Sequence, residues 1–457
     1  MRAQAARGHR VGYVFAGRHY PWSTRTRLSR WASDGVVMYE LLGSAINTHW
    51  STGTRYPDLD LQEPESEAAF ARVLEQARPD VVHFQELAGL PSSLLEQAKG
   101  GGIPVVLTLH DYYSVCPTAR LLDRNGERCL RHEVGEDCER NCASAPAGYG
   151  HLIEETLRYE LRRSRRAVPV LTRISDQSLE PAIRRLKELP GRQPPGGLPV
   201  AHSLVAGHWP SPAAFQRRRD VNVARLRMCD RLIAPSTRAA EIYALLGVDR
   251  ERVTVQRLTL PHLERLTARR GPEVGAPVTF VTLGACGYLS KGSRAIVEAV
   301  RELERAGRGA DYRLLIMGWA EPAVEKELSR IPSVSLLGPY QPDDLDLTLD
   351  SADVGIVPSI WEETHGFVGV EMLAKGLPVI GSALGGIPEY VIPGETGWLN
   401  RSATGAELAA IMQAALDAPT AIEQLRRSVR EKRDSIVRPM ATHVAEVEAL
   451  YAELMDR

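Results

Sequence analysis

The sequence lacks several features that would each indicate a different class of protein. Its apolar runs stay well short of the roughly 18 residues that a membrane-spanning helix needs. Its net charge of −1 is far from the positive excess of a general nucleic-acid binder. No Gly-x-Gly-x-x-Gly motif follows the first strand-like run of either half, which argues against a nicotinamide dehydrogenase. We therefore expect a cytoplasmic protein without a nucleic-acid partner, for which any membrane contact is peripheral and on the inner face.

The alternation of apolar and amphipathic segments predicts the fold class. At 457 residues the chain is too long for one ordinary hydrophobic core. Short apolar runs separated by helix-like stretches indicate parallel sheets covered by helices on both faces. The pattern occurs twice, so we predict an α/β protein with two doubly wound, Rossmann-like domains. The predicted strands are RVGYVFAG, DVVHFQEL, IPVVLTLHD and DRLIAPS in the first half, and VTFVTLGA, RLLIMG, SVSLLG, ADVGIVPS and LPVIGSA in the second.

The predicted domain boundary lies in a charged segment that contains Gly and Pro, residues 261–277. We expect an N-terminal domain over 1–265, with Cys-rich and basic insertions over about 116–215. A C-terminal domain follows over 277–435. Residues 436–457 are expected to form a helix that packs back on the first domain.

The most informative stretch is PSIWEETHGFVGVEMLAKGLPVIGSALGGIPEYVIPGETGWL, residues 358–399. It reads as a strand end, a loop, a helix, a second strand and a glycine-rich loop. Glu363 lies in the loop and Glu371 in the helix, with seven residues between them. Unpaired amides and the positive dipole end at the start of that helix, near Phe367, form an anion site suited to a diphosphate. The two acids should then accept hydrogen bonds from sugar hydroxyls, because phosphate would repel them.

This stretch resembles the Glu-x7-Glu signature of the family-4 retaining glycosyltransferases, which have the GT-B fold, with two domains facing each other across a cleft. The resemblance implies that Glu363 contacts the transferred sugar and that Glu371 binds the ribose of the nucleotide. It also implies that the backbone amides of Gly366, Phe367 and Val368 hold the sugar and the phosphate.

Two further segments resemble the same family. VTLGACGYLSKGSRAIVEAV is similar to the loop in which an Arg and a Lys bind the diphosphate. Lys291 stands at the Lys position, whereas Cys286 stands where the Arg usually falls. TLHDYYSVCP is similar to the family's His-Asp turn, so His110 is a candidate to bind the sugar or orient the acceptor hydroxyl. The catalytic residues implied are His110, Lys291 and Glu363.

The base and acceptor sides are less well marked. VSLLGPYQPDDLDLTLDSADVGIVPS resembles the family's base-binding strand and loop, and it makes Gly338 and Tyr340 candidates to pack around the base. The N-terminal loop GRHYPWSTRT departs from the family's usual Gly-Gly turn. Arg18 and Ser23 in this loop are candidates for the acceptor side.

No metal is expected in catalysis. In other glycosyltransferases Asp-x-Asp triplets hold a divalent metal on the diphosphate. Of the two triplets here, the one at 344–346 fits the first turn of a helix, where acids favour the dipole. The other, at 58–60, lies in an acidic loop. We interpret neither as a metal site, and we expect catalysis to require no cofactor.

Two segments leave alternatives open. Four cysteines crowd one polar, turn-rich stretch: Cys116, Cys129, Cys138 and Cys142. Their thiolates could close a structural zinc site, or they could be free thiols, while disulfides are disfavoured in the cytosol.

The basic stretch 158–187 could attract anionic lipid or a phosphorylated acceptor, although we favour a solvated helix face.

The resemblance implies a hexosyltransferase that uses a UDP-, GDP- or dTDP-sugar. The acceptor could be a small molecule, a lipid or a glycan, and the anomeric configuration would be retained. Catalysis would rest on placed dipoles and charges that stabilise the departing diphosphate and an oxocarbenium-like sugar. One alternative is a catalytically silent nucleotide-sugar-binding module, which Cys286 favours. Another is a GT-B epimerase or hydrolase. The sugar, the base, the acceptor and the oligomeric state stay open.

Overall fold

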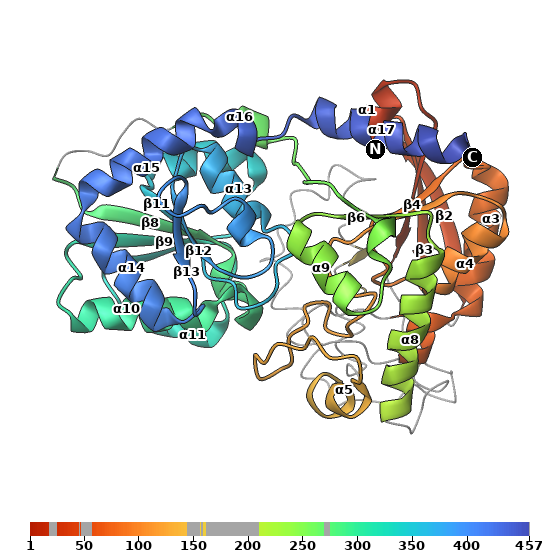
Figure 1. The fold of residues 1–457 in the computed structure, drawn as a ribbon, viewed down its shortest axis with the longest axis horizontal. Coiled ribbons are helices and arrows are strands. Elements are labelled where there is room, and N and C mark those ends of the chain that lie inside the picture. The colour runs from red at the N-terminus through yellow and green to blue at the C-terminus, as the bar shows by residue number, and fades with distance from the viewer. Residues whose placement is uncertain are drawn as a thin grey trace. The chain divides into compact units, whose positions relative to one another are not determined.

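The computed structural model describes residues 1–17, 25–44, 46, 57–143, 156, 159–160, 210–268 and 275–456. The chain divides into two compact units (Figure 1). The first comprises Met1–Val106, Tyr113–Ala119 and Arg131–Asp230, and the second comprises Leu107–Tyr112, Arg120–Leu130 and Arg231–Arg457. Among the helices in the described ranges, none combines the length and the apolar character needed to span a bilayer.

A small mixed sheet opens the chain. Its order is β1-β3-β2, with β1 parallel to β3 and β2 antiparallel to β3. The strands are β1 (Val11–Ala16), β2 (Arg27–Ser33) and β3 (Val36–Leu42). Asp34 and Gly35 connect β2 to β3 with φ angles of 51° and 78°. Two consecutive positive φ angles are what the tight turns of β-hairpins require, and Asp-Gly supplies them at low cost.

A second sheet has the order β4-β5-β6-β7. Its strands are β4 (Val82–Phe84), β5 (Val105–Thr108), β6 (Arg231–Ala234) and β7 (Val253–Val255). All four residues of β5 are buried, as expected for an apolar strand covered on both faces. The helices along this part of the chain are α1 (Arg2–Ala6), α2 (Pro57–Leu61), α3 (Pro64–Ala77), α4 (Ser93–Gly100), α5 (Gly135–Asn141), α8 (Pro212–Met228) and α9 (Thr237–Leu245).

The third sheet has six strands in the order β10-β9-β8-β11-β12-β13, and every pair in it is parallel. The strands are β8 (Val278–Leu283), β9 (Tyr312–Met317), β10 (Val334–Gly338), β11 (Val354–Val357), β12 (Val379–Ser382) and β13 (Gly397–Asn400). Consecutive strand residues enter two separate cores: Phe280 and Ile356 belong to one, Val281 and Val357 to the other. The sheet is therefore covered on both faces, which confirms the doubly wound pattern predicted from the sequence.

Helices and short 3-10 turns connect these strands. The helices are α10 (Ser293–Arg305), α11 (Pro322–Leu328), α12 (Leu345–Thr348), α13 (Phe367–Ala374), α14 (Gly405–Asp417), α15 (Pro419–Glu431), α16 (Arg433–Ile436) and α17 (Met440–Met455). The 3-10 turns are η2 (Arg250–Arg252), η3 (Leu263–Arg265), η4 (Ala285–Gly287), η5 (Leu289–Lys291), η6 (Pro342–Asp344), η7 (Leu349–Ser351) and η8 (Ile387–Glu389). The final helix α17 is present where the sequence predicted one, and its packing on the first domain stays a prediction.

Candidate functional site

The loop between β11 and α13, residues 358–366, leaves the sheet at the carboxyl end of β11. In parallel α/β sheets, ligands bind beyond the carboxyl ends of the strands. The side chains of residues 361–365 are unusually buried for a loop, because each of these residues is at most 7% exposed. Buried polar and charged groups are stable only where they are paired or hydrogen-bonded, so the partners of this loop define the site.

Glu363 is the centre of the first set of contacts. Its Oε1 accepts hydrogen bonds from Nζ of Lys291 and from Oγ of Ser359, each at 2.7 Å. The Lys291 ammonium also lies 5.1 Å from the ring centre of Trp361. Burial alone would raise the pKa of Glu363, but the charge of Lys291 and the hydrogen bonds outweigh it and lower the pKa. Glu363 is therefore held as a carboxylate beside a cation.

The backbone around Lys291 is tightly constrained. Gly292 has a φ of 91°, and a Cβ atom there would lie 2.0 Å from the carbonyl oxygen of Pro358. Ile360 donates its N–H to the carbonyl of Ser290 at 3.0 Å. Only glycine permits this close approach of the two loops, which brings Lys291 to Glu363 across 72 residues of sequence.

The start of α13 lies at the end of the same loop. Gly366 precedes the helix with a φ of 78°, and its carbonyl accepts a 3.0 Å hydrogen bond from the Tyr390 hydroxyl. Phe367 and Val368 are the first residues of α13, where backbone N–H groups have no acceptor within the helix. These amides and the positive end of the helix dipole favour an anion at this position.

Glu371 lies further along α13 and has a partner that the sequence did not predict. Its Oε1 lies 2.6 Å from Nε2 of His262, and both residues are buried. Burial raises the pKa of Glu371, while the contact with His262 acts against this rise. Burial and the charge of Glu371 raise the pKa of Tyr340 to about 12. Gly338, the other residue predicted to pack around the base, ends β10.

His110 also meets this loop. Its backbone carbonyl accepts a 2.5 Å hydrogen bond from the Thr364 hydroxyl. Burial, with a smaller contribution from the charge of His443, lowers the pKa of His110 to about 4. The imidazole is therefore neutral near pH 7, and a neutral imidazole can both donate to a hydroxyl and accept from one.

Two family models match the chain. One, described as a glycosyl transferase 4-like domain, matches residues 1–145, and the other, described as glycosyl transferases group 1, matches residues 277–418. Together they cover more than half of the sequence. The chain belongs to the GT-B glycosyltransferases.

Relatives with curated functions match only part of the chain. The D-inositol 3-phosphate glycosyltransferase of Rhodococcus erythropolis is 28% identical over 50% of this chain and 57% of its own length. The corresponding protein of Corynebacterium aurimucosum is 30% identical over 35% of this chain and 40% of its own length. The glycogen synthase of Mycobacterium tuberculosis is 28% identical over 51% of this chain and 58% of its own length. The chain thus matches about half of the length of these relatives, or less.

Solved structures show the same GT-B fold. Sucrose-phosphate synthase from Thermosynechococcus elongatus aligns with a TM-score of 0.61 at 17% identity, over 100% of this chain and 91% of that one. Anabaena HepE in complex with UDP aligns with a TM-score of 0.51 at 13% identity, over 84% of this chain and 82% of that one. At these identities the likeness shows the fold alone, which consists of two α/β parts with parallel sheets.

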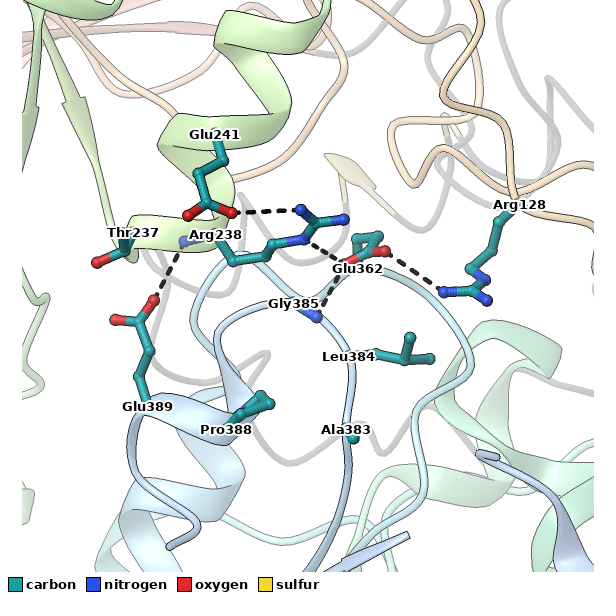
Figure 2. Close-up of a pocket in the computed structure, with 10 residues that line it drawn as sticks. All are labelled: Arg128, Thr237, Arg238, Glu241, Glu362, Ala383, Leu384, Gly385, Pro388 and Glu389. Atoms are coloured by element: carbon teal, nitrogen blue, oxygen red, sulfur yellow. Dashed lines mark hydrogen bonds and ion pairs between the residues drawn. The ribbon is translucent and has the colours of Figure 1, made fainter. Parts of the chain in front are cut away.

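Sequence reasoning about this glycosyltransferase missed a second cluster of charges, around Glu362 (Figure 2). The Glu362 carboxylate is 3% exposed and accepts a 2.9 Å hydrogen bond from the backbone N–H of Gly385. Its other partners are Arg238 Nε at 3.4 Å and Arg128 Nη1 at 3.5 Å. The consecutive acids Glu362 and Glu363 gave a signal in the sequence, whereas nothing near them in sequence indicated the two arginines.

The four cysteines do not gather into a zinc site, which was one of the alternatives left open by the sequence. In the described ranges, which contain Cys116, Cys129, Cys138 and Cys142, no three His, Cys, Asp or Glu side chains form a group that could hold a metal ion. All four are free thiols; burial raises the pKa of Cys116, whereas a hydrogen bond with Cys142 lowers the pKa of Cys138. The geometry favours the free-thiol alternative.

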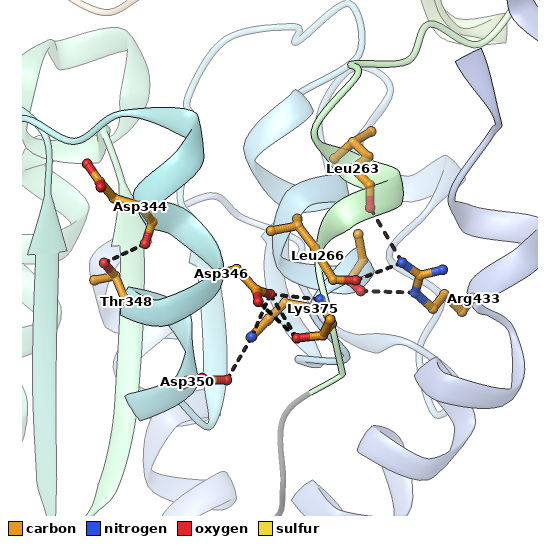
Figure 3. Close-up of polar contacts among 10 residues, drawn as sticks. Leu263, Leu266, Asp344, Asp346, Thr348, Asp350, Lys375 and Arg433 are labelled. Carbon is orange, nitrogen blue, oxygen red and sulfur yellow. Dashed lines mark hydrogen bonds and ion pairs between the residues drawn. The ribbon is translucent and has the colours of Figure 1, made fainter. Parts of the chain in front are cut away.

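The Asp-x-Asp triplet at 344–346 has structural partners. Asp346 accepts a hydrogen bond from Lys375 Nζ at 2.7 Å (Figure 3). It also accepts one from the backbone N–H of Thr267 at 2.7 Å. Lys375 is fully buried and also pairs with Asp350 at 2.7 Å. In the other triplet, Asp60 pairs with Arg218 at 2.7 Å, and both side chains are 2% exposed.

The two predicted acceptor-side residues, Arg18 and Ser23, lie outside the described residues, as does most of the basic stretch 158–187.

Proposed function

We propose that this chain transfers a hexosyl group from a nucleotide diphosphate-sugar to an acceptor hydroxyl, with retention of anomeric configuration and without a metal ion. The observation that carries the proposal is the ion pair between Lys291, which is partly exposed, and the buried Glu363, in the loop that leads into α13. The pair and the helix amides supply a cation and N–H donors for a diphosphate, and a carboxylate for a sugar hydroxyl, in one place.

The remaining predicted residues extend this arrangement. Glu371 would accept hydrogen bonds from the ribose, with the base beside Gly338 and Tyr340. His110, neutral near pH 7, would bind a hydroxyl of the sugar or of the acceptor. Cytoplasmic location and peripheral membrane contact stay predictions.

The transfer step needs no protein nucleophile. The acceptor oxygen forms a bond to the anomeric carbon on the face from which the diphosphate leaves. The bond from that carbon to the phosphate oxygen breaks, and its electron pair stays on the diphosphate. The proton of the acceptor hydroxyl passes to the departing phosphate oxygen. Lys291 and the amides of Phe367 and Val368 would stabilise the negative charge that develops there.

The test is isothermal titration of UDP and of UDP-, GDP- and dTDP-sugars into the wild-type protein and the variants Glu363→Gln and Glu371→Gln. UDP is the first probe because the solved structure of Anabaena HepE contains it. Glu325→Gln, an exposed position on α11, is the matched control. We expect a nucleotide sugar to bind wild type and control, and to bind both site variants more weakly. UDP, which lacks the transferred sugar, should bind more weakly to Glu371→Gln. Equal affinity in all four proteins, or an inverted anomer in the product, contradicts the proposal.

A catalytically silent sugar-nucleotide-binding module is the second candidate, and Cys286 favours it. This thiol is fully buried, and burial with the charge of Glu321 raises its pKa to about 12. It therefore adds no positive charge where the family usually has an arginine. Donor binding without transfer to any acceptor and without release of free sugar would favour this second function.

A further inference from the structure

A cavity of about 400 Å³ lies beside Glu362, in the second compact unit (Figure 2). Arg238 and Glu241 reach it from α9, and Arg128 from the segment 120–130. Glu389 closes another side, together with the apolar side chains of the chain after β12. The volume is within the range of natural small-molecule sites and is large enough for a single six-membered ring with its hydroxyls.

The two arginines keep hydrogen-bonding capacity for a ligand. Their contacts with Glu362, at 3.4 Å for Arg238 and 3.5 Å for Arg128, are longer than the roughly 2.7–2.9 Å of a strong charge-assisted hydrogen bond. The Arg128 side chain is 51% exposed and the Arg238 side chain 39%. Each guanidinium has five N–H groups, so these contacts leave donors available to the cavity.

Carboxylates outnumber cations in the lining. Glu241 pairs with Arg238 Nη1 at 3.3 Å, and Glu389 accepts the backbone N–H of Arg238 at 3.2 Å. With Glu362 they make three carboxylates against two guanidinium groups. A phosphate or sulfate entering the cavity would be repelled by this excess. A ring with neutral hydroxyls can donate to the carboxylates and accept from the arginines at once, while Leu384 and Pro388 face its C–H groups.

The cavity is joined to the candidate donor site by adjacent backbone. Glu362 and Glu363 are consecutive, and so are Gly385 and Gly386. The first glycine contacts the first glutamate, and the second glycine contacts the second. Gly385 N–H donates to the Glu362 carboxylate at 2.9 Å, and Gly386 N–H donates to the Glu363 carbonyl at 2.7 Å. A ligand held against Glu362 would thus be bound by the residue that precedes Glu363, which we assign to the transferred sugar.

We propose that this cavity binds the acceptor, and that the acceptor is a neutral polyhydroxylated ring, a sugar or a cyclitol without a phosphate. The acceptor role in this inference rests on the proposed function, whereas the binding of neutral polyols to the cavity does not depend on it. It distinguishes this chain from the relatives whose printed substrate is an inositol 3-phosphate.

The test measures polyol binding and UDP binding separately in the full-length protein. Saturation-transfer NMR is recorded with myo-inositol, glucose and maltose, and with inositol 3-phosphate and glucose 6-phosphate as the charged counterparts. Titration calorimetry gives the affinity for UDP. The proteins are wild type, Glu362→Gln, Arg238→Lys and the exposed control Glu325→Gln.

We expect at least one neutral polyol to bind wild type and the control more tightly than its phosphorylated counterpart. Glu362→Gln should weaken that binding by about tenfold or more, because the acceptor of the ligand's hydrogen bond loses its charge. The UDP affinity of this variant should stay within about twofold of wild type. Arg238→Lys, at a partly exposed position, gives the same comparison if the Glu362 variant does not fold.

Three results of the polyol measurements overturn the inference. They are tighter binding of the phosphorylated compounds, polyol binding unaffected by either variant, and no binding of any neutral polyol to wild type. Loss of UDP binding in every protein, with polyol binding intact, would instead contradict the proposed function and leave a polyol site. Equal weakening of UDP binding in the Glu362 variant would mean that the residue belongs to the donor site, and it would also overturn the inference.

Discussion

Replacing His262 with alanine tests the part of the candidate site that surrounds Glu371. His262 and Glu371 are 8% and 6% exposed, and their Nε2 and Oε1 atoms are 2.6 Å apart. Burial raises the pKa of Glu371, and the contact with His262 acts against the rise. The alanine variant leaves the buried carboxyl group without the imidazole, and it also opens a cavity where the ring was.

The expected loss can be estimated from these features. A buried polar group that loses its partner costs about 1–3 kcal/mol, and more where the group is charged. The cavity adds to this cost. We therefore expect the free energy of unfolding of His262→Ala to fall by about 3 kcal/mol. His262→Gln keeps an N–H donor at a similar reach and should lose only about 1 kcal/mol. If Glu371 binds the ribose, the alanine variant should also bind UDP about tenfold more weakly, because its carboxylate is no longer oriented.

Urea unfolding followed by tryptophan fluorescence gives the stability, and titration calorimetry gives the UDP affinity. His132→Ala is the matched control, because His132 is exposed and should change stability by no more than about 0.5 kcal/mol. Equal stability of the two alanine variants would refute the energetic argument. Lost stability with unchanged UDP affinity would show that the pair is structural and that Glu371 does not contact the nucleotide.

Three further predictions follow from the charges of the site. The pKa values of His110 and His365 are lowered to about 4, so the unfolded chain binds more protons than the folded protein between pH 6.5 and 4. The free energy of unfolding should fall as pH drops through that window, by up to about 3 kcal/mol for each histidine. In urea unfolding at several pH values, His110→Gln should lose less stability over this window than wild type. An equal loss in the two proteins would contradict the role of His110. Lys291→Met should raise the pKa of Glu363 and weaken UDP binding by about tenfold or more, and unchanged calorimetric affinity would remove Lys291 from the site. EDTA should leave the turnover of the donor sugar unchanged, whereas activity restored by Mg²⁺ or Mn²⁺ would disprove metal independence.

Most strands could be predicted from the sequence because they are apolar on both faces. Each apolar run named at the outset is a strand in the structure. The strands β2, β3, β7 and β13 were missed, and all of these except β3 lie at the edge of a sheet. An edge strand has fewer neighbours and needs less apolar sequence, as the mostly polar RLSRWAS of β2 illustrates. The Asp-Gly pair between β2 and β3 did carry a hairpin signal that apolar runs alone could not supply.

The candidate site could be predicted only where one continuous motif carries it. The positions of Glu363, Lys291 and the start of α13 follow from local sequence, and the structure brings them together. His262 and Arg238 lie far from their acidic partners in sequence, and an ordinary His or Arg gives no local sign of such a contact. Only the folded chain brings them to α13 and to the loop after β11. The roles of all these residues stay predictions until the variants are measured.

The burial of Lys375 makes its reactivity a measure of local unfolding around this side chain. Its amine is fully enclosed and held by Asp346 and Asp350, whereas Lys326 on α11 is exposed. An amine-reactive reagent such as acetic anhydride can therefore modify Lys326 at once, but it can reach Lys375 only when the surrounding helices separate. The ratio of the two labelling rates, read by mass spectrometry, would follow the local unfolding of this region in the unmutated chain.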